Sequence, residues 1–255
     1  MKNLLFIPAY NCEKQITRVL KKIQNMKNFE SFEILMINNQ SKDNTLNAAL
    51  KYKIDNHFTK LTIVSNEINI GLGGTHKMAF QYALDNQFDG CLILHGDDQG
   101  NIQDIPFDLF NNDFFLFGSR FKFKSRLINY SLFRITGNIV FNLLASLVCM
   151  KIVSDFGGSG LNYFPTNKLK DHSFWNYPDD LTFHAYLLLN ILRMKQSFRY
   201  FPVTWSETDQ ISNVKLASQT IKYFKILFEY FSHNKLIDEH CKANSKEYTS
   251  WIYHN

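Results

Sequence analysis

The chain has 255 residues, of which 45% are hydrophobic and 20% charged, the composition of an ordinary globular protein. This excludes a disordered, collagenous or disulfide-scaffold chain, as do four cysteines that stand far apart without a CxxC pair. The 28 basic residues exceed the 23 acidic ones by five. This mild excess suits a phosphate-bearing ligand or an anionic membrane surface, and it does not indicate nucleic acid.

Apolar runs alternate with amphipathic segments through the first half of the chain. Five runs that are almost continuously apolar predict strands buried on both faces, as in a mostly parallel sheet covered by helices. These runs are Leu4–Ile7, Glu33–Ile37, Leu61–Val64, Cys91–Leu94 and Phe114–Phe117. Helical spacing of apolar residues, such as that of Ile16, Val19 and Leu20, predicts a helix after each of the first three runs. We expect a Rossmann-like α/β fold that binds its ligand at the carboxyl ends of the strands.

The second half has a different character. Residues 121–150 are basic and then apolar, and residues 151–165 are rich in glycine. The pattern then predicts a helix over Asp180–Met194, a strand over Phe198–Val203 and a helix over Val214–Phe231. The polar tail after Ser232 has no strong pattern, and no domain boundary is evident.

Two apolar segments bear on membrane insertion. The N-terminal run is too short for a signal peptide. The stretch Ile139–Met150, about twelve residues, falls short of the roughly twenty that span a bilayer. We therefore expect a protein that is cytoplasmic or lies on the cytoplasmic face of a membrane without crossing it.

Polar sequences follow the first five predicted strands, and this coincidence predicts one site at their ends. They are Pro8-Ala9-Tyr10-Asn11, Asn38-Asn39-Gln40-Ser41-Lys42-Asp43-Asn44-Thr45, Asn69-Ile70-Gly71-Leu72-Gly73-Gly74, His95-Gly96-Asp97-Asp98-Gln99 and Gly118-Ser119-Arg120. Asp97 and Asp98 would repel each other unless a cation offset their charge, so they indicate either an Mg²⁺ or Mn²⁺ site or a solvated turn. The glycine cluster indicates either a phosphate loop or a tight turn that opens a helix, with His76 beside it.

The ordered set of these sequences resembles the family 2 glycosyltransferases with the GT-A fold. Four further sequences look like the dolichol-phosphate mannose synthase branch of that family. They are Gly118-Ser119-Arg120-Phe121, Arg134 with Gly137-Asn138, Asp155 with Ser159-Gly160, and Pro202-Val203-Thr204-Trp205. The resemblance covers about residues 3–215.

The resemblance implies a GT-A domain over 1–232 and a polar tail over 233–255. The nucleotide-sugar half would comprise about residues 1–120. The acceptor-side half, about 121–232, would include a C-terminal helical extension. The implied activity is transfer of a sugar from a UDP- or GDP-sugar, assisted by Mg²⁺ or Mn²⁺ and inverting, to a polyprenyl phosphate.

The resemblance also implies roles for individual residues. The catalytic residues would be Asp97, Arg120 and Asp155, the metal ligands Asp97 and Asp98, and the acceptor-side residues Ser159, Gly160 and Asp180. The donor-binding residues would be Pro8, Ala9, Tyr10, Asn11, Asn38, Asn39, Ser41, Asn69, Gly71, Gly73, His76, Gly96, Asp98 and Gln99.

The sequence departs from the family pattern at three places. His95 occupies the first position of the DxD motif, and asparagines stand at positions 38 and 39 in place of aspartates. The segment around His184 lacks the usual acidic residues. Two alternatives therefore remain open: a saccharide-extending transferase of capsule or lipopolysaccharide assembly, and a GT-A scaffold with a decayed site.

Contact with a membrane rests on a basic loop and two apolar helical stripes. Arg120, Lys122, Lys124 and Arg126 alternate with apolar residues, which suits either a solvated loop or a surface facing lipid headgroups. The stripes are Ile139, Val140, Leu143, Leu144, Leu147 and Val148, and Ile221, Phe224, Leu227, Phe228 and Phe231. Each stripe fits either a core helix or a helix lying in the membrane interface.

Overall fold

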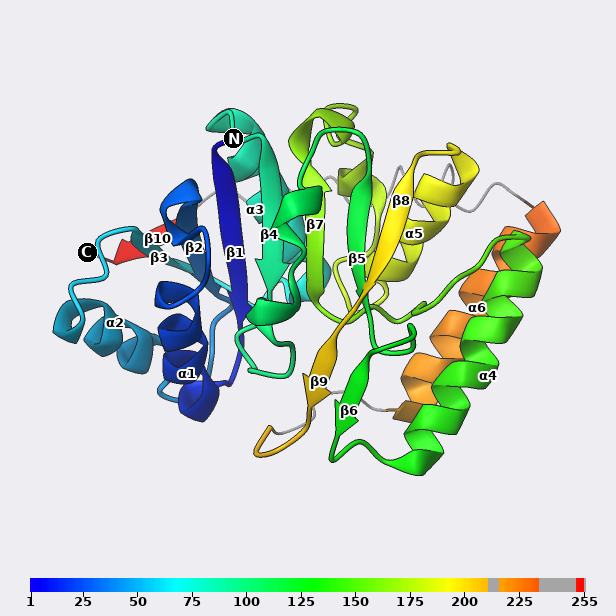
Figure 1. Cartoon of the computed structure of the whole chain (residues 1–255), viewed down its shortest axis with the longest axis horizontal. Helices are drawn as coiled ribbons and strands as arrows, with labels where there is room; N and C mark the ends of the chain where they lie inside the picture. Colours follow the sequence, from blue (N-terminus) through cyan, green and yellow to red (C-terminus); the bar gives the residue numbers. More distant parts are fainter. Residues whose placement is uncertain (211–215, 234–250, 255) are drawn as a thin grey trace.

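The computed structural model describes residues 1–210, 216–233 and 251–254. An eight-stranded sheet runs through this part of the chain, in the order β10-β3-β2-β1-β4-β7-β5-β8 (Figure 1). Its strands are β1 (Asn3–Ala9), β2 (Phe32–Asn38), β3 (Leu61–Asn66), β4 (Gly90–Leu94), β5 (Phe115–Ser119), β7 (Leu161–Pro165), β8 (Phe198–Pro202) and β10 (Trp251–His254). A small parallel sheet pairs β6 (Arg126–Ile128) with β9 (Thr204–Ser206).

Helices cover both faces of the large sheet. They are α1 (Glu13–Gln24), α2 (Thr45–Asp55), α3 (Gly71–Asp85), α4 (Leu132–Cys149), α5 (Phe183–Arg193) and α6 (Leu216–His233). Short 3-10 helices lie between these elements: η1 (Phe29–Ser31), η2 (Ile102–Asp104), η3 (Phe107–Leu109), η4 (Thr166–Lys168) and η5 (Ser173–Asn176).

Successive residues of β1 enter two different hydrophobic cores. Leu4 and Phe6 pack in the core beneath α3 and α5, and Leu5 and Ile7 pack in the core beneath α1 and α2. Strands β1, β2, β3 and β4 are parallel to one another. The predicted α/β fold, with a mostly parallel sheet between helices, is confirmed.

Two strands of the large sheet, β7 and β10, were not expected from the sequence, nor were the two strands of the small sheet. Strand β7 lies between β4 and β5 and is antiparallel to both, so β4 and β5 are not neighbours. It follows Gly158 and Gly160, whose φ angles of +74° and +68° turn the chain into it. Strand β10 pairs antiparallel with β3 and belongs to the predicted polar tail, of which 234–250 and 255 lie outside the described residues.

The predicted second-half elements are present with shifted bounds. Helix α5 starts three residues later than expected, because Asp180 accepts hydrogen bonds from the backbone and hydroxyl of Thr182 just before the helix. Helix α6 is described from Leu216, and positions 214 and 215 of the predicted helix lie outside the described residues.

Helix α4 is longer than the sequence pattern indicated. It has 18 residues with a mean hydropathy of 1.6, and only 17% of them are buried. By length and composition alone it could cross a membrane, which corrects the expectation drawn from the shorter stretch 139–150. However, it packs along α6 through Phe141 and Phe224, whose ring centres are 5.0 Å apart.

Three histidines meet beneath the carboxyl ends of the strands. The ring of His76 packs edge-on to Phe6 and 5.8 Å from the ring of His95, and His184 interacts electrostatically with both. Burial lowers their pKa values, to about 3 for His76 and about 4 for His95 and His184. The three imidazoles are therefore neutral near pH 7.

We expect the free energy of unfolding to fall as the pH decreases below about 6.5. In that range the three histidines are protonated in the unfolded chain and remain neutral in the folded protein. Each histidine contributes up to about 1.4 kcal/mol per pH unit between its unfolded and folded pKa values. His76→Asn should therefore reduce the slope of unfolding free energy against pH, measured by urea denaturation between about pH 7 and pH 5.

Carboxylates that titrate in both proteins contribute equally to the two slopes, so their contribution cancels when the slopes are compared. His172→Asn, at an exposed position, is the matched control for loss of one imidazole. An unchanged slope in His76→Asn would show that the cluster does not govern acid stability.

Candidate functional site

The polar sequences predicted to converge do meet at one edge of the sheet, where β1, β2 and β4 end (Figure 1). The backbone of Gly96 donates a hydrogen bond to the Pro8 carbonyl over 3.0 Å, and that of Asn39 donates to Ala9 over 2.9 Å. Asn11, just beyond Tyr10, donates its backbone N–H to the Ser41 hydroxyl over 3.1 Å. These contacts join the ends of three strands into one surface.

The two asparagines at the end of β2 hold the loop that follows β3. The Asn39 side-chain oxygen accepts from Asn66 and from the Ile70 backbone, and its amide donates to Asn69 over 3.0 Å. Asn38 donates to the Ser65 hydroxyl over 3.1 Å and accepts from the Ser41 backbone. An aspartate at position 39 could not donate to Asn69, so this network accounts for asparagine where the family pattern has an acid.

The glycine cluster faces protein rather than an open phosphate site. A Cβ atom on Gly71 would lie 2.3 Å from the Asp179 carbonyl oxygen, and one on Gly73 would lie 2.4 Å from the Pro178 carbonyl oxygen. The Gly74 backbone donates to the Asp179 carbonyl over 3.2 Å. This packing favours the interpretation of the cluster as the tight turn that opens α3, and the donor-binding role of Gly71 and Gly73 stays a prediction.

Lys77, one turn further along α3, fastens the same loop. Its fully buried ammonium group donates to the Tyr177 carbonyl and lies 2.6 Å from an oxygen of Asp179. Burial lowers the pKa of Lys77, and the Asp179 carboxylate opposes this shift. The loop before α5 is thus held against the start of α3 by a buried charge pair.

Asp98 forms ion pairs with two basic residues of α1. Its φ angle of +61° turns its side chain toward α1, where one oxygen lies 2.9 Å from Arg18 Nε and the other 2.6 Å from Lys22 Nζ. Arg18 also pairs with Asp209 over 2.8 Å. Two cations of the protein already pair with Asp98, which weighs against its expected metal and donor role; that role stays a prediction.

Asp97 is the acid of this cluster that remains available. Its side chain accepts the backbone N–H of Gln99 over 3.2 Å, and no ion pair to it is found among the described residues. Burial raises the pKa of Asp97 to about 6, and the charges of Asp98 and Glu207 add to this rise. A divalent cation beside this carboxylate would favour its charged form.

Arg120 and Asp155 form a buried ion pair. Asp155 is fully buried and accepts the Arg120 backbone N–H, its Nε at 2.9 Å and its Nη2 at 2.7 Å. Burial alone would lower the pKa of Arg120, but the field of Asp155 outweighs burial and raises it. Each group neutralises the charge of the other, and the catalytic roles expected for Arg120 and Asp155 stay predictions.

The expected acceptor-side residues also have structural partners. The Ser159 hydroxyl donates to the Gly118 carbonyl over 2.8 Å. A Cβ on Gly160 would lie 2.7 Å from the ring of His95. Asp180 lies 2.5 Å from Lys222 Nζ; partial burial would raise the pKa of Asp180, but Lys222 and Thr182 lower it.

Glu207 is the acidic residue that the sequence analysis missed. It lies two positions after the quoted Trp205, and its charge acts on Asp97. Arg134 Nη1 donates to both of its carboxylate oxygens, over 2.7 Å and 2.6 Å. The indole nitrogen of Trp205 and the Nε of Arg134 are buried without a hydrogen-bond partner among the described residues. The sequence analysis named Arg134 and Trp205, which lie near Glu207, but it did not name Glu207 itself.

The residues that could hold a metal are few. Within 1–210, 216–233 and 251–254 no group of three histidine, cysteine or acidic side chains is placed to bind an ion. Asp97 still fits a divalent cation, since Mg²⁺ and Mn²⁺ often bind one or two carboxylates and complete their coordination with ligand phosphates and water. Among the remaining expected donor residues, Gly96 and Gln99 lie next to Asp97 in the sequence, and the hydrogen bond from Gly96 to Pro8 brings the end of β1 beside them.

Comparison with known proteins identifies the first part of this chain. Residues 5–106 match the family model described as Glycosyl transferase family 2. No curated protein matches the sequence.

Several solved structures share the fold over most of their length. Glucosyl-3-phosphoglycerate synthase from Mycobacterium tuberculosis, in complex with UDP, is 12% identical, with a TM-score of 0.63 over 89% of this chain and 79% of that one. S. aureus TarS with UDP-GlcNAc is 18% identical, with a TM-score of 0.54 over 94% and 70%. The mannosyltransferase PcManGT from Pyrobaculum calidifontis, with GDP-Man and Mn²⁺, is 13% identical, with a TM-score of 0.55 over 94% and 72%.

These findings confirm the predicted fold and the predicted enzyme class. The assignment to the dolichol-phosphate mannose synthase branch stays a prediction. Residues 5–106 thus match the glycosyltransferase family 2 model, and the chain that contains them has the fold of GT-A glycosyltransferases.

Proposed function

We propose that this protein transfers a sugar from a UDP- or GDP-sugar to a polyprenyl phosphate, with inversion and with the help of Mg²⁺ or Mn²⁺. The observation that carries the proposal is Asp97, a half-buried carboxylate at the end of β4 beside the ends of β1 and β2. The family match over 5–106 and neighbours solved with UDP, UDP-GlcNAc and GDP-Man support a nucleotide-sugar donor.

Asp97 would hold the metal, which when bound offsets the charge of the donor diphosphate as the leaving group departs. The chain's own residues do the positioning. The asparagine network shapes the floor of the nucleotide pocket, and the Gly96 backbone holds the end of β4 against β1. Trp205 and the Arg134–Glu207 pair border the acceptor side.

The pairing of the other acids favours a phosphate acceptor. A hydroxyl acceptor must lose a proton to a general base, but a phosphate is already ionised near pH 7. Asp155, Asp180 and Glu207 are each paired with an arginine or lysine. A polyprenyl phosphate therefore demands less of these residues than a saccharide hydroxyl does.

The donor site is tested by Asp97→Asn, which keeps the shape of the side chain and removes its charge. Calorimetric titration with UDP- and GDP-sugars should show binding that depends on Mn²⁺ in the unaltered protein. In Asp97→Asn the affinity should fall at least about tenfold, as expected for loss of a charged metal ligand.

Asp98→Asn is the matched control, since it removes the neighbouring charge and breaks only the contacts to Arg18 and Lys22. It should bind the donor as the unaltered protein does. If a folded protein binds neither donor with Mn²⁺, the transferase proposal fails and a scaffold with a decayed site replaces it.

The acceptor class is tested by Asp180→Asn. We expect turnover with polyprenyl phosphate to stay within about twofold, because Asp180 accepts hydrogen bonds from Thr182 before α5, pairs with Lys222 and is not required as a base. Initial rates with polyprenyl phosphate and with a saccharide acceptor provide the measurement.

A loss of about a hundredfold or more in turnover, with unchanged donor affinity and melting temperature, would identify Asp180 as a general base. That result would favour the saccharide-extending alternative. Asp155→Asn is less informative, because breaking the buried pair with Arg120 lowers stability as well as activity.

A further inference from the structure

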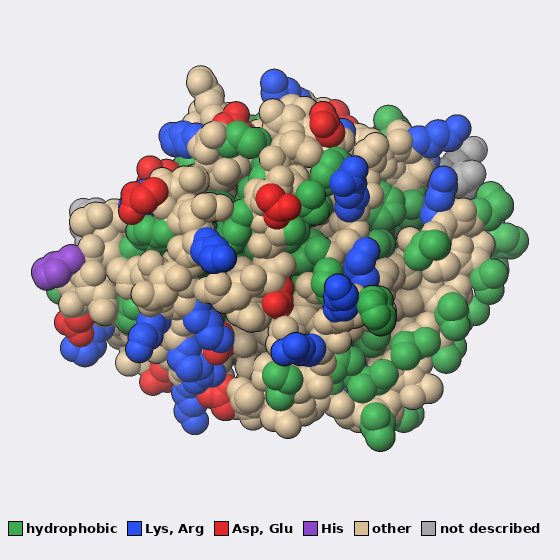
Figure 2. All heavy atoms as spheres, viewed as in Figure 1, with side chains coloured by type: hydrophobic (Ala, Val, Ile, Leu, Met, Phe, Trp, Pro, Cys, Tyr) green, Lys and Arg blue, Asp and Glu red, His purple; other side chains and the backbone are tan. Residues whose placement is uncertain are grey.

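An exposed apolar surface covers one edge of the molecule, where α4 and α6 lie side by side (Figures 1 and 2). We call it the α4–α6 face and define it by Leu143, Leu147, Met150, Ile221, Phe228 and Phe231. Leu147 is 74% exposed, Met150 88% and Phe228 70%. Contiguous apolar surface of this extent on a folded protein marks an interaction site.

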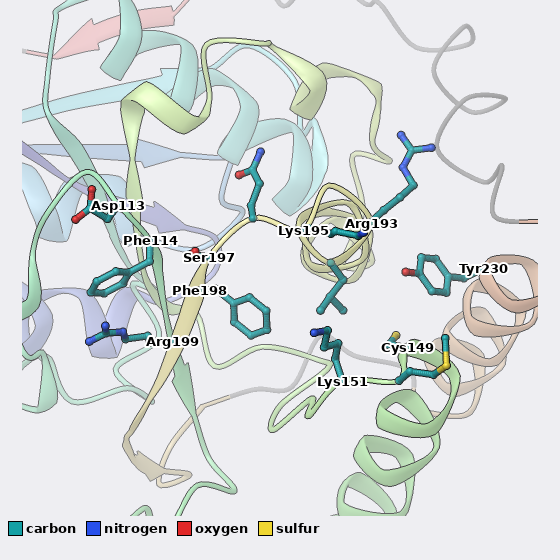
Figure 3. A pocket seen from close by; sticks show the side chains of 13 residues that line it. Asp113, Phe114, Cys149, Lys151, Arg193, Lys195, Ser197, Phe198, Arg199 and Tyr230 are labelled. Atoms are coloured by element: carbon teal, nitrogen blue, oxygen red, sulfur yellow. The ribbon is translucent and has the colours of Figure 1, made fainter.

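Basic residues lie at both ends of this face. Near the start of α4, Lys122, Lys124 and Arg126 are exposed beside Phe123, which is 85% exposed. At the other end a groove of about 860 Å³ opens between the ends of α4 and α5 and the start of β8 (Figure 3). Its lining includes Lys151, Arg193, Lys195 and Arg199, with Asp113 as its acid.

Helix α4 is attached to the rest of the protein along its inner side. The Asn142 side chain donates to the Ser154 carbonyl over 3.0 Å and accepts from the Phe156 backbone over 2.9 Å. Ser146 accepts from the Val153 backbone over 2.9 Å. A helix held this way cannot cross a bilayer while the domain stays folded, so its apolar side can only lie along a surface.

We propose that the α4–α6 face docks on an anionic lipid bilayer, with α4 parallel to the membrane plane and lipid phosphates in the basic groove. The apolar side chains would enter the interface, and the basic residues at each end would meet anionic headgroups. A helix of 18 residues is about 27 Å long, so the two basic regions would contact well-separated lipids.

Charge selects a membrane over a second copy of this chain. If two copies packed through this face, in either helix direction, basic ends would meet basic ends, and this repulsion opposes association. An anionic bilayer complements both ends at once. The inference stands on the surface alone, and its test measures binding without donor or turnover, so its outcome is separate from that of the proposed function.

The experiment is flotation of the purified protein with vesicles of phosphatidylcholine, alone or with about 30% phosphatidylglycerol. We expect binding to the mixed vesicles that weakens as salt rises. The double variant Leu143→Asp/Leu147→Asp should bind at least about tenfold more weakly, because it places charge in the apolar face. Ile54→Asp, on α2 and 64% exposed in the parent, is the matched control and should bind normally.

The basic groove is tested by Lys151→Glu/Lys195→Glu, which should lose about tenfold in binding to the mixed vesicles and little to phosphatidylcholine alone. Lys21→Glu/Lys27→Glu, two exposed positions of the donor half, is the control of equal charge. Melting temperatures of all variants verify folding.

Failure of the unaltered protein to float, or normal flotation of Leu143→Asp/Leu147→Asp, would overturn the proposal. If the unaltered protein sediments as a dimer and does not bind vesicles, and the double variant sediments as a monomer, the face would instead bind a second copy of the chain.

Discussion

The buried pair of Arg120 and Asp155 joins the two halves of this molecule. Asp155 receives three hydrogen bonds from Arg120 at the end of β5, which fasten the strand to the segment that leads into β7. The guanidinium carbon lies 5.1 Å from the ring centre of Trp205 and 6.0 Å from that of Tyr130. Removing one partner of such a pair typically costs about 3–5 kcal/mol, a large part of a domain stability of about 5–15 kcal/mol.

Ion pairs of the same kind neutralise other acidic residues near the ends of the strands. Asp155 forms an ion pair with Arg120, and Glu207 forms one with Arg134. Asp98 pairs with both Arg18 and Lys22. Each acid is neutralised within the protein, and Asp97 stands apart from them. Among the described residues Asp97 has no ion pair, so its carboxylate is available for the metal that the proposed function requires.

The sequence predicted the strands well because burial on both faces leaves a local signal. The run Leu4–Ile7 is apolar throughout, since alternate side chains enter two cores. Strand β7 lacked such prominence because it follows a glycine-rich turn, and its place between β4 and β5 depends on pairing with residues about seventy and forty-five positions earlier.

The same reasoning placed the polar residues at the strand ends but did not predict the partners of their side chains. The position of a polar residue at a strand end can be inferred from local pattern, but its partner cannot. Asp98 meets Arg18 across 80 residues, and Asp155 meets Arg120 across 35. In the sequence both acids look available, and the fold supplies the cations that occupy them. Gly71 and Gly73 likewise resemble a phosphate loop until the loop at 178–180 is seen to lie against them.

A chain of contacts connects the ion pair with the helix that carries the α4–α6 face. Arg120 donates to the Tyr130 hydroxyl over 3.4 Å, and the Asn138 amide on α4 donates to the same oxygen over 3.2 Å. Arg134, one turn earlier on α4, stacks over Tyr130 at 4.6 Å and holds Glu207 beside Asp97. The polar side of the first turns of α4 thus belongs to the site, while its opposite side forms the exposed apolar face. With that face on a bilayer, a lipid phosphate would approach Asp97 along the start of α4, past the residues that this helix itself positions.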